Sequence, residues 1–450
     1  MYSFSKKLKI SAIVFMILGA LGIAYGFLTI PNSIEDVKQL TEQQNEGHNE
    51  ANAADVIEQN ADHSTENNME VSEGSESEHL THALHSLQNR PYAAIFIAMF
   101  FFFMIALGTL VFYAIQYASQ AGWSIVLFRV MEGITAYLLP GSLFILAFLI
   151  ISVLNGHYFY TWMNPEFYNP QSELYDEMLV GKSWWLNVPF WMIRTFIFLL
   201  GWNIYRYFAV KNSLAQDSGV DLTHYKKNFK ASVFFLLFFA VTESMMAWDW
   251  IMSLTPHWLS TLFGWYVFAT LFVSSITVIA MVTIYLKSKG FLPQVNNSHF
   301  HDLAKFMFGF SIFWTYLWFS QFMLIWYANM PEETAYFTPR LLGPYQLLFM
   351  GMLISNFVFP ILVLMNSDFK RIPWFIISTG IIILLGHYID IFVMISPATV
   401  GNHWQIGIPE IGSVLFFLGL FIYVVFNALT KSPLNAKGNP FITESEHFHY

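Results

Sequence analysis

Residues 93–118 read AAIFIAMFFFFMIALGTLVFYAIQYA, a run without Asp, Glu, Lys or Arg. A helix needs about 20 apolar residues to cross the ~30 Å hydrocarbon core of a bilayer. This run is long enough, and we predict that it is a transmembrane helix.

The composition of the whole chain extends this interpretation. Of its 450 residues, 56% are hydrophobic and only 11% are charged, whereas soluble domains carry about 25% charged residues. Aromatic residues make up 19% of the chain, which is typical of proteins with aromatic belts at both membrane interfaces. A soluble multi-domain enzyme is therefore excluded, and we expect an all-α polytopic membrane protein.

We predict ten transmembrane spans. The first follows Lys6, Lys7 and Lys9, but its apolar stretch is longer than the 7–15 residues of a signal peptide core, so we interpret it as a membrane anchor. The third span is long enough to begin as an interfacial turn, and Pro140 should kink it. The spans are roughly 8–29, 93–118, 124–154, 185–208, 231–253, 259–286, 304–329, 342–365, 372–395 and 409–429.

The distribution of Lys and Arg predicts the orientation. With the N-terminus inside, fifteen of these residues lie on the inner side and four on the outer side, while Arg129 and Arg194 lie within spans. Positive residues favour the cytoplasmic side, so both termini are expected there. The segments expected to face outward are 31–92, 155–184, 330–341 and 396–408.

Segment 31–92 holds thirteen acidic residues against Lys38 and Arg90. Its composition, rich in Glu, Asn and Ser, is typical of a chain that cannot bury enough apolar area to order itself. We expect a poorly ordered acidic arm that lies on a basic outer partner. A metal site is the alternative, because the arm contains His48, His63, His79, His82 and His85.

The chain contains no cysteine, which excludes disulfides, Cys-ligated zinc, iron–sulfur clusters and covalently attached c-type haem. His387 is the one histidine well inside a span, whereas a b-type haem usually needs two axial ligands. We therefore expect no metal and no redox cofactor on this chain, and any redox role requires partner subunits.

An ionisable side chain in the middle of a span raises the free energy of membrane insertion by about 2.5–3.5 kcal/mol, so each one requires an explanation. By helical rise, most are expected to cluster in the outer half of the membrane, whereas Arg129 and Glu132 lie in the inner half, three residues apart, and should pair. The outer cluster comprises Arg194, Glu243, Asp249, His387 and Asp390.

Two groups of these polar residues share helix faces. His387 and Asp390 form one group, and Thr242, Asp249 and Ser253 form the other. Rows of protonatable and hydroxyl groups are typical of a proton relay. The alternative is that each group only holds two helices together, through a hydrogen bond or ion pair with one neighbouring side chain.

A possible internal repeat relates two halves of the chain. Asp249 precedes Pro256 by seven residues and Asp390 precedes Pro397 by seven, and a His-Trp pair follows each proline. We predict two related four-helix bundles, spans 2–5 and 6–9, with spans 1 and 10 flanking them and one equivalent acid site in each bundle. The expected units are an anchor (1–30), the arm (31–92), the two bundles (93–253 and 259–395) and a last helix with a cytoplasmic tail (409–450).

Residues 242–258, TESMMAWDWIMSLTPHW, together with the ten spans, resemble the NrfD/polysulfide-reductase family of membrane subunits. The closest likeness is to the second NrfD-like subunit of alternative complex III, the bacterial quinol:cytochrome c oxidoreductase. The resemblance covers the chain from about residue 93 onward.

The resemblance implies an integral subunit of the bacterial inner membrane that provides a proton pathway coupled to quinol oxidation. Its partners would be a paralogous NrfD-like subunit, an iron–sulfur subunit and multi-haem c-type cytochromes, with no nucleic acid involved. Glu243, Asp249, His387 and Asp390 would handle protons, and we expect Arg194, Arg129 and Glu132 to belong to the same pathway.

Three other functions stay open. The chain could be a purely structural anchor, or a secondary quinol-binding subunit that uses His387, Asp390 and Trp318. A stand-alone transporter would need Gly- or Pro-broken helices at matched positions of both halves, and Pro140 has no such match.

Overall fold

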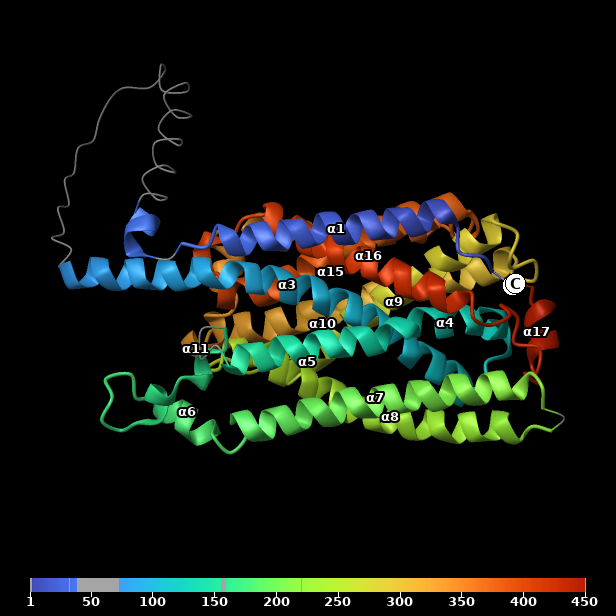
Figure 1. Cartoon of the computed structure of the whole chain (residues 1–450), viewed down its shortest axis with the longest axis horizontal. Coiled ribbons are helices and arrows are strands. Elements are labelled where there is room, and N and C mark those ends of the chain that lie inside the picture. Colours follow the sequence, from blue (N-terminus) through green and yellow to red (C-terminus); the bar gives the residue numbers. More distant parts are fainter. Residues whose placement is uncertain (1, 32, 39–72, 155–158, 220, 450) are drawn as a thin grey trace, which may run out of the picture.

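The computed structural model describes residues 2–31, 33–38, 73–154, 159–219 and 221–449. This part of the chain contains helices and no strand, and ten of its helical segments are long and apolar enough to cross a membrane. The all-α polytopic fold is therefore confirmed (Figure 1).

The ten long segments run back and forth between two ends of the molecule (Figure 1). They are α1 (Lys6–Leu28), α3 (Glu73–Ala118), η1 to α5 (Gly122–Leu154), α7 (Val188–Gln216), α8 (Thr223–Trp250), α9 (Leu262–Ser288), α10 (Asn297–Ala328), α13 to α14 (Gln346–Leu364), α15 (Pro373–Thr399) and α16 (Ile408–Leu429).

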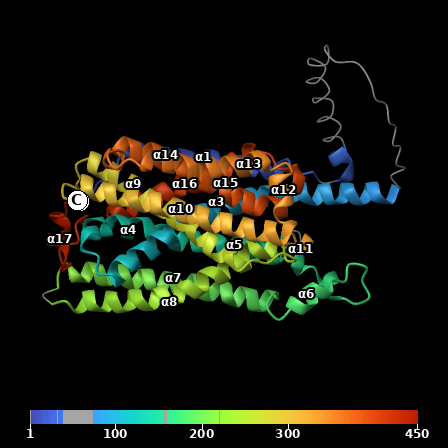
Figure 2. The same cartoon turned by 180° about the vertical axis from the view of Figure 1, so that it is seen from behind.

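Short helices mark the two ends. At one end, called the arm end, lie α6 (Glu177–Lys182), α11 (Pro331–Thr334) and α12 (Thr338–Leu341), as Figures 1 and 2 show. The other end, called the tail end, carries α17 (Ile442–Glu446) and the C-terminus. The charge distribution predicts that the arm end faces outward and the tail end faces the cytoplasm.

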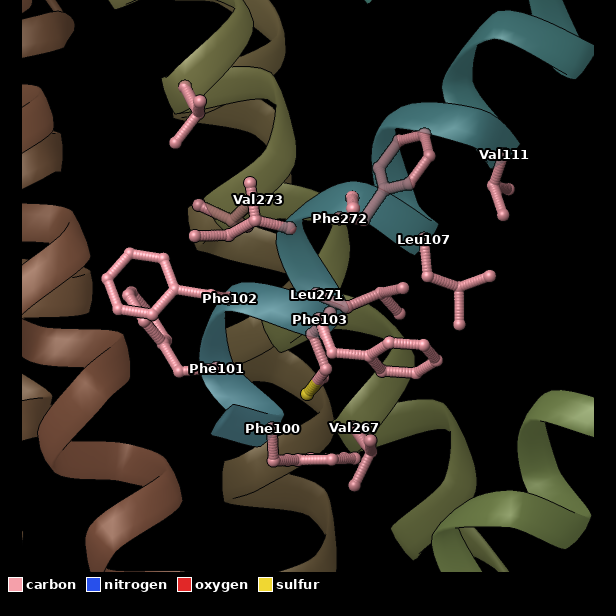
Figure 3. Packing of buried hydrophobic residues seen from close by; sticks show 14 of the residues in the cluster. Phe100, Phe101, Phe102, Phe103, Leu107, Val111, Val267, Leu271, Phe272 and Val273 are labelled. Carbon is pink, nitrogen blue, oxygen red and sulfur yellow. The ribbon is translucent and has the colours of Figure 1, made fainter. Parts of the chain in front are cut away.

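Helices α3 and α9 form the centre of the molecule. In their most apolar windows 94% and 89% of the residues are buried, against 56% or less in the other eight segments. The two helices approach closely, because a Cβ on Gly108 would lie 2.2 Å from the Ser275 hydroxyl oxygen. Around this contact Phe, Leu and Val side chains interdigitate, as Figure 3 shows for Phe103, Leu107 and Leu271.

The contacts between helices close into two groups of four. In the first group, α3 and α7 each pack on α5 and on α8. In the second group, α9 and α14 each pack on α10 and on α15. Helices α1 and α16 flank the groups and pack on each other, with Gly22 against Gly412. This arrangement agrees with the predicted bundles of spans 2–5 and 6–9.

Helix α3 begins at Glu73, well before the predicted start at residue 93, so the last part of the expected unordered arm is helical. Tertiary hydrogen bonds tie the end of this extension to other segments, among them one from the Gln88 amide to the Pro31 carbonyl at 3.3 Å. Arg90 Nε donates to Glu410 Oε1 on α16 at 2.7 Å, and the Asn89 amide donates to the Thr399 carbonyl at 3.3 Å. Of the arm histidines, His48 and His63 lie outside the described residues, as do the side chains of His79 and His82.

Two segments depart from α-helical geometry. The third span begins as η1 (Gly122–Leu127) and α4 (Phe128–Ile134), which confirms the expected turn at its start. It passes through η2 (Thr135–Tyr137) into α5 (Leu138–Leu154), so the helix is interrupted just before Pro140, where a kink was predicted. In the eighth span a π-helical turn, η6 (Ile354–Val358), separates α13 (Gln346–Leu353) from α14 (Phe359–Leu364). Pro360 has no N–H for the Asn356 carbonyl four residues earlier, which explains this turn.

Candidate functional site

The seven ionisable residues predicted inside spans are all buried, but they do not form one cluster. They separate into a pair in the first bundle near the arm end, a pair in the second bundle near the arm end, and a pair near the tail end. Glu243 stands apart from all three.

In the first bundle Asp249 is fully engaged by donors. Arg194 donates from Nε to Oδ2 at 2.6 Å and from Nη2 to Oδ1 at 2.8 Å, and the Trp185 indole donates to Oδ1 at 3.0 Å. The guanidinium also stacks on the rings of Trp185 and Phe190, at 4.1 and 4.4 Å from their centroids. Such a bidentate, stacked ion pair fixes α7 against α8 and leaves the carboxylate little freedom to exchange protons.

The hydroxyl groups on the Asp249 face of α8 do not connect it to other acids. Thr242 donates to the Phe238 carbonyl, and Ser253 donates to the carbonyl of Asp249 itself at 2.6 Å. Glu243 accepts one long bond from Ser244 at 3.4 Å, and its Oε1 is buried without a partner in the described structure. The predicted row of relay groups on this helix is therefore occupied by local hydrogen bonds.

In the second bundle Asp390 accepts hydrogen bonds from neutral donors. Tyr266 donates to Oδ1, while Thr270 and the Trp314 indole donate to Oδ2 at 2.8 and 3.0 Å. The donors come from α9 and α10, and the described residues place no arginine in an ion pair with this carboxylate. Asp249 lies next to the last residue of α8 and Asp390 lies nine residues before the end of α15, and the chemical environments of the two acids also differ.

His387 lies one turn from Asp390 on α15, with its Nδ1 3.6 Å from Oδ2. The imidazole is fully buried, and neither ring nitrogen has a hydrogen-bond partner in the described structure. The Trp314 ring meets it edge-on, with 5.5 Å between centroids. The histidine is therefore close enough to exchange a proton with Asp390 after a small rotation or through one water molecule.

Further buried polar atoms without a partner in the described structure lie on α10, the π-helical turn and α15 of the second bundle. By helical rise along α15 and α10, Gln321 lies roughly 10 Å, Asp390 14 Å, His387 18 Å, Ser311 26 Å and Thr379 30 Å from the arm end. Buried polar atoms nearly always bind protein or ordered water, so we call this row the polar column and regard it as a place for water. Its unpartnered atoms are Trp318 Nε1, Gln321 Nε2, Ser311 Oγ, Asn356 Oδ1 and Nδ2, Thr379 Oγ1, and both His387 nitrogens.

The π-helical turn and one glycine place Asn356 in this column. A Cβ on Gly386 would lie 2.2 Å from Asn356 Oδ1, so only glycine lets the amide reach the backbone of α15 beside His387. Asn356 lies within the predicted eighth span, but the sequence did not predict the turn that positions it.

A cavity beside Asp390 joins the column to Arg340. The cavity has a volume of about 10 Å³, which is room for roughly one water molecule. Tyr266, Gln321, Tyr336, Arg340 and Asp390 are among its lining residues.

Arg340 was predicted only as a positive charge of an outer loop, yet the structure buries it. It donates to the carbonyls of Val393 and Met394 at 3.0 and 3.2 Å, and it stacks on Tyr336. In the described part of the chain it forms no ion pair with an acid. Burial lowers the pKa of this guanidinium from its ordinary value, and its charge faces the same cavity as the Asp390 carboxylate.

Near the tail end, the expected pairing of Arg129 and Glu132 is confirmed at 2.5 Å. The structure adds Asp217, which forms a second ion pair with Arg129, and Tyr113, which donates to Glu132 at 3.0 Å. Asp217 also accepts from the amide of Gly438, so the C-terminal tail closes this site. Asp217 was not predicted because it lies beyond the expected end of the fourth span.

Trp318 was predicted with His387 and Asp390 as a quinol site. Its ring stacks on Trp314 and Phe322, and it lines the small cavity beside Asp390. That cavity holds about one water molecule and no quinone ring, so a quinol site here stays a prediction that requires the cavity to widen.

Comparison with models of known protein families and with curated proteins finds no match for this chain. The fold and the buried sites therefore define its class: a polytopic helical membrane protein with two four-helix bundles, an ion-paired acid in one and a hydroxyl-bound acid in the other.

Proposed function

We propose that this chain is a non-redox integral subunit of a bacterial respiratory quinol oxidoreductase, of the NrfD-like type found in alternative complex III, and that its second bundle conducts protons. The assignment to this type rests on the resemblance of residues 242–258. The proton role rests on one structural observation, the polar column of unpartnered buried atoms around Asp390 and His387.

The proposed pathway moves a proton and forms no covalent intermediate. Protonated Asp390 passes its proton to a nitrogen of neutral His387, either by rotation of the ring or through one water molecule. From the imidazole the proton continues through water bound by Asn356 and Ser311, while Asp390 is reloaded from the cavity that it shares with Arg340.

Arg340 would act from the cavity that it shares with Asp390. The guanidinium and the carboxyl line the same space, which has room for roughly one water molecule. The carbonyls of Val393 and Met394 hold the guanidinium in the observed position.

The first bundle has a different role in this proposal. The Arg194–Asp249 ion pair holds α7 against α8. The ion pair between Arg129 and Asp217 stabilises the tail end. Of the residues first predicted to handle protons, we keep His387 and Asp390 in the pathway and assign Asp249 and Arg194 to stability. Glu243, with a buried free oxygen, is a separate candidate for which no connected polar partner is described.

The rival functions are less well supported by the geometry. A purely structural anchor would be expected to satisfy its buried polar groups with each other, whereas the polar column leaves them unpartnered. For a transporter, broken helices are expected at matched positions of the two bundles. The eighth span is broken before Pro360, but the fourth span, which holds the matching place in the first bundle, is the continuous helix α7 (Val188–Gln216).

Purification of the full chain from its native membranes tests the assignment. We expect it to co-purify with haem-bearing and cysteine-rich iron–sulfur subunits, in a complex that reduces cytochrome c with quinol. Isolation as a lone protein, with no haem absorption and no iron in the preparation, would overturn the assignment.

A further inference from the structure

A crevice of about 600 Å³ runs along the membrane-spanning part of the molecule between α15 and α16. Its floor is formed by α3 and α9, and its lining is apolar apart from Tyr388 and Glu410. Leu385 and Ile411 in its walls are 59% and 53% exposed, so the crevice is open to the surrounding membrane. Protein interiors rarely leave voids larger than a water molecule, so a crevice of this size is a place for a ligand.

The dimensions of the crevice fit a hydrocarbon chain. The α15 wall extends from Ile381 to Phe392, about 17 Å at 1.5 Å per residue, which is close to the thickness of one bilayer leaflet. The crevice is apolar along this whole length and open on one side, which suits an extended acyl chain.

A polar cavity continues the crevice at the arm end. A narrow passage shares Phe392 and Glu410 with the crevice, and it shares Arg90, Trp404 and Gln405 with a polar cavity of about 470 Å³. Trp404 stacks on Tyr345, as aromatic residues at a membrane interface commonly do. An apolar groove at the depth of the hydrocarbon core thus leads into a polar chamber at its rim.

The polar chamber is rich in hydrogen-bond donors. Glu410 is the one acid at its junction, and its carboxylate already accepts from Arg90 Nε and Nη2 and from the Gly407 amide. The ion pair uses two of the three nitrogens of the Arg90 guanidinium, Nε and Nη2. The side chains of Asn402, His403 and Gln405 add further polar groups to the lining of the chamber. This arrangement complements a head group rich in acceptor oxygens, such as a phosphodiester.

We infer that the crevice binds one phospholipid, with an acyl chain between α15 and α16 and its phosphate in the chamber beside Arg90. The lipid packs against α3 and α9 and so fills the gap between the second bundle and the flanking helices. This inference does not depend on the proposed proton pathway, because no residue of the polar column lines the crevice.

Photo-crosslinking identifies the occupant directly. A benzophenone amino acid at Leu385 in the full-length protein, purified with its partners and washed in detergent, should form an adduct with the mass of a phospholipid. The same probe at Leu237, which is 66% exposed on α8, serves as the control and should lose its lipid adducts during washing. An adduct at Leu385 with protein or with a quinone, or no retained lipid, would overturn the inference.

A filled crevice gives a second, independent test. The Leu415→Trp variant places an indole in the crevice and should reduce the tightly bound phosphorus by one phospholipid per chain, while Leu237→Trp should leave the content unchanged. Equal phosphorus in both variants and in the unmodified protein would contradict the site.

Discussion

His387 and Asp390 lie one turn apart on α15, with the imidazole Nδ1 3.6 Å from the carboxylate Oδ2, a distance too long for a hydrogen bond. The carboxylate is held by Tyr266, Thr270 and Trp314, whereas the imidazole has no hydrogen-bond partner in the described structure. The carboxylate is thus held by three donors, whereas the buried imidazole keeps both nitrogens available for a proton or a water molecule. This asymmetry is suited to passing a proton from one group to the other.

Replacement of His387 tests the mobile half of this pair. We expect His387→Gln to slow proton-coupled quinol oxidation at least about tenfold, because general acid–base groups contribute roughly 10²–10⁴ in rate. The thermal stability should change little, since the ring makes no hydrogen bond. The measurement is turnover in H₂O and D₂O, and the solvent isotope effect should increase.

The matched control for this variant is His447→Gln, a histidine at the exposed tail end. If both variants keep the rate and the isotope effect of the unmodified protein, His387 is a packing residue.

The Arg194–Asp249 pair should behave as a structural element. Asp249→Asn leaves a buried guanidinium without its charge partner, and we expect a loss of about 3–5 kcal/mol in the free energy of unfolding. The double variant Arg194→Met/Asp249→Leu removes both charges and should recover most of that loss. Thermal unfolding of the purified protein in detergent measures both effects.

The same double variant separates stability from function. If Asp249 is a brace, the complex that carries both replacements should release as many protons per electron as the unmodified complex. A reduced ratio in this stable variant would place Asp249 back in the proton pathway.

Gly438 provides a test of the closed tail end. Its amide donates to Asp217, and a Cβ at this position would lie 2.0 Å from the Gln216 carbonyl. We expect Gly438→Ala to displace the tail, which also includes Ser445, the residue whose hydroxyl accepts from the Val126 amide. Hydrogen exchange should then accelerate at Val126 and its neighbours and stay unchanged at the arm end.

Gly309→Ala is the control for this replacement, because a Cβ there meets no atom within 4 Å. Unchanged exchange at Val126 in Gly438→Ala would show that the tail is held by other contacts.

The ten spans could be predicted from the sequence because apolar length is a local signal, and the repeat that relates Asp249–Pro256 to Asp390–Pro397 suggested the two bundles. The extension of α3 could not, since it depends on Arg90 and Glu410, which are 320 positions apart. The donors around Asp390 escaped prediction for a similar reason. Tyr266 and Trp314 resemble ordinary aromatic residues of a membrane span, and only helix packing decides that they face a carboxylate.

The clearest misjudgement concerned the charged groups. Depth along each helix suggested one outer cluster, but depth does not say which helices are neighbours, and the structure divides the cluster between two bundles. Arg340 was expected in the segment 330–341 between two spans, where it lies on α12, but its burial and its bonds to α15 were not predicted.

The most direct test of the proton pathway is the number of protons released per electron by the complex in sealed vesicles when Asp390 is changed to Asn. The amide keeps one accepting oxygen and turns its NH₂ toward the remaining donors, so the ratio is measured in complexes that are shown to be assembled. Asp368→Asn at an exposed position is the control for charge. The account predicts a lower ratio in Asp390→Asn and an unchanged ratio in Asp368→Asn. An unchanged ratio in Asp390→Asn, at normal assembly, would contradict the claim that the second bundle conducts protons.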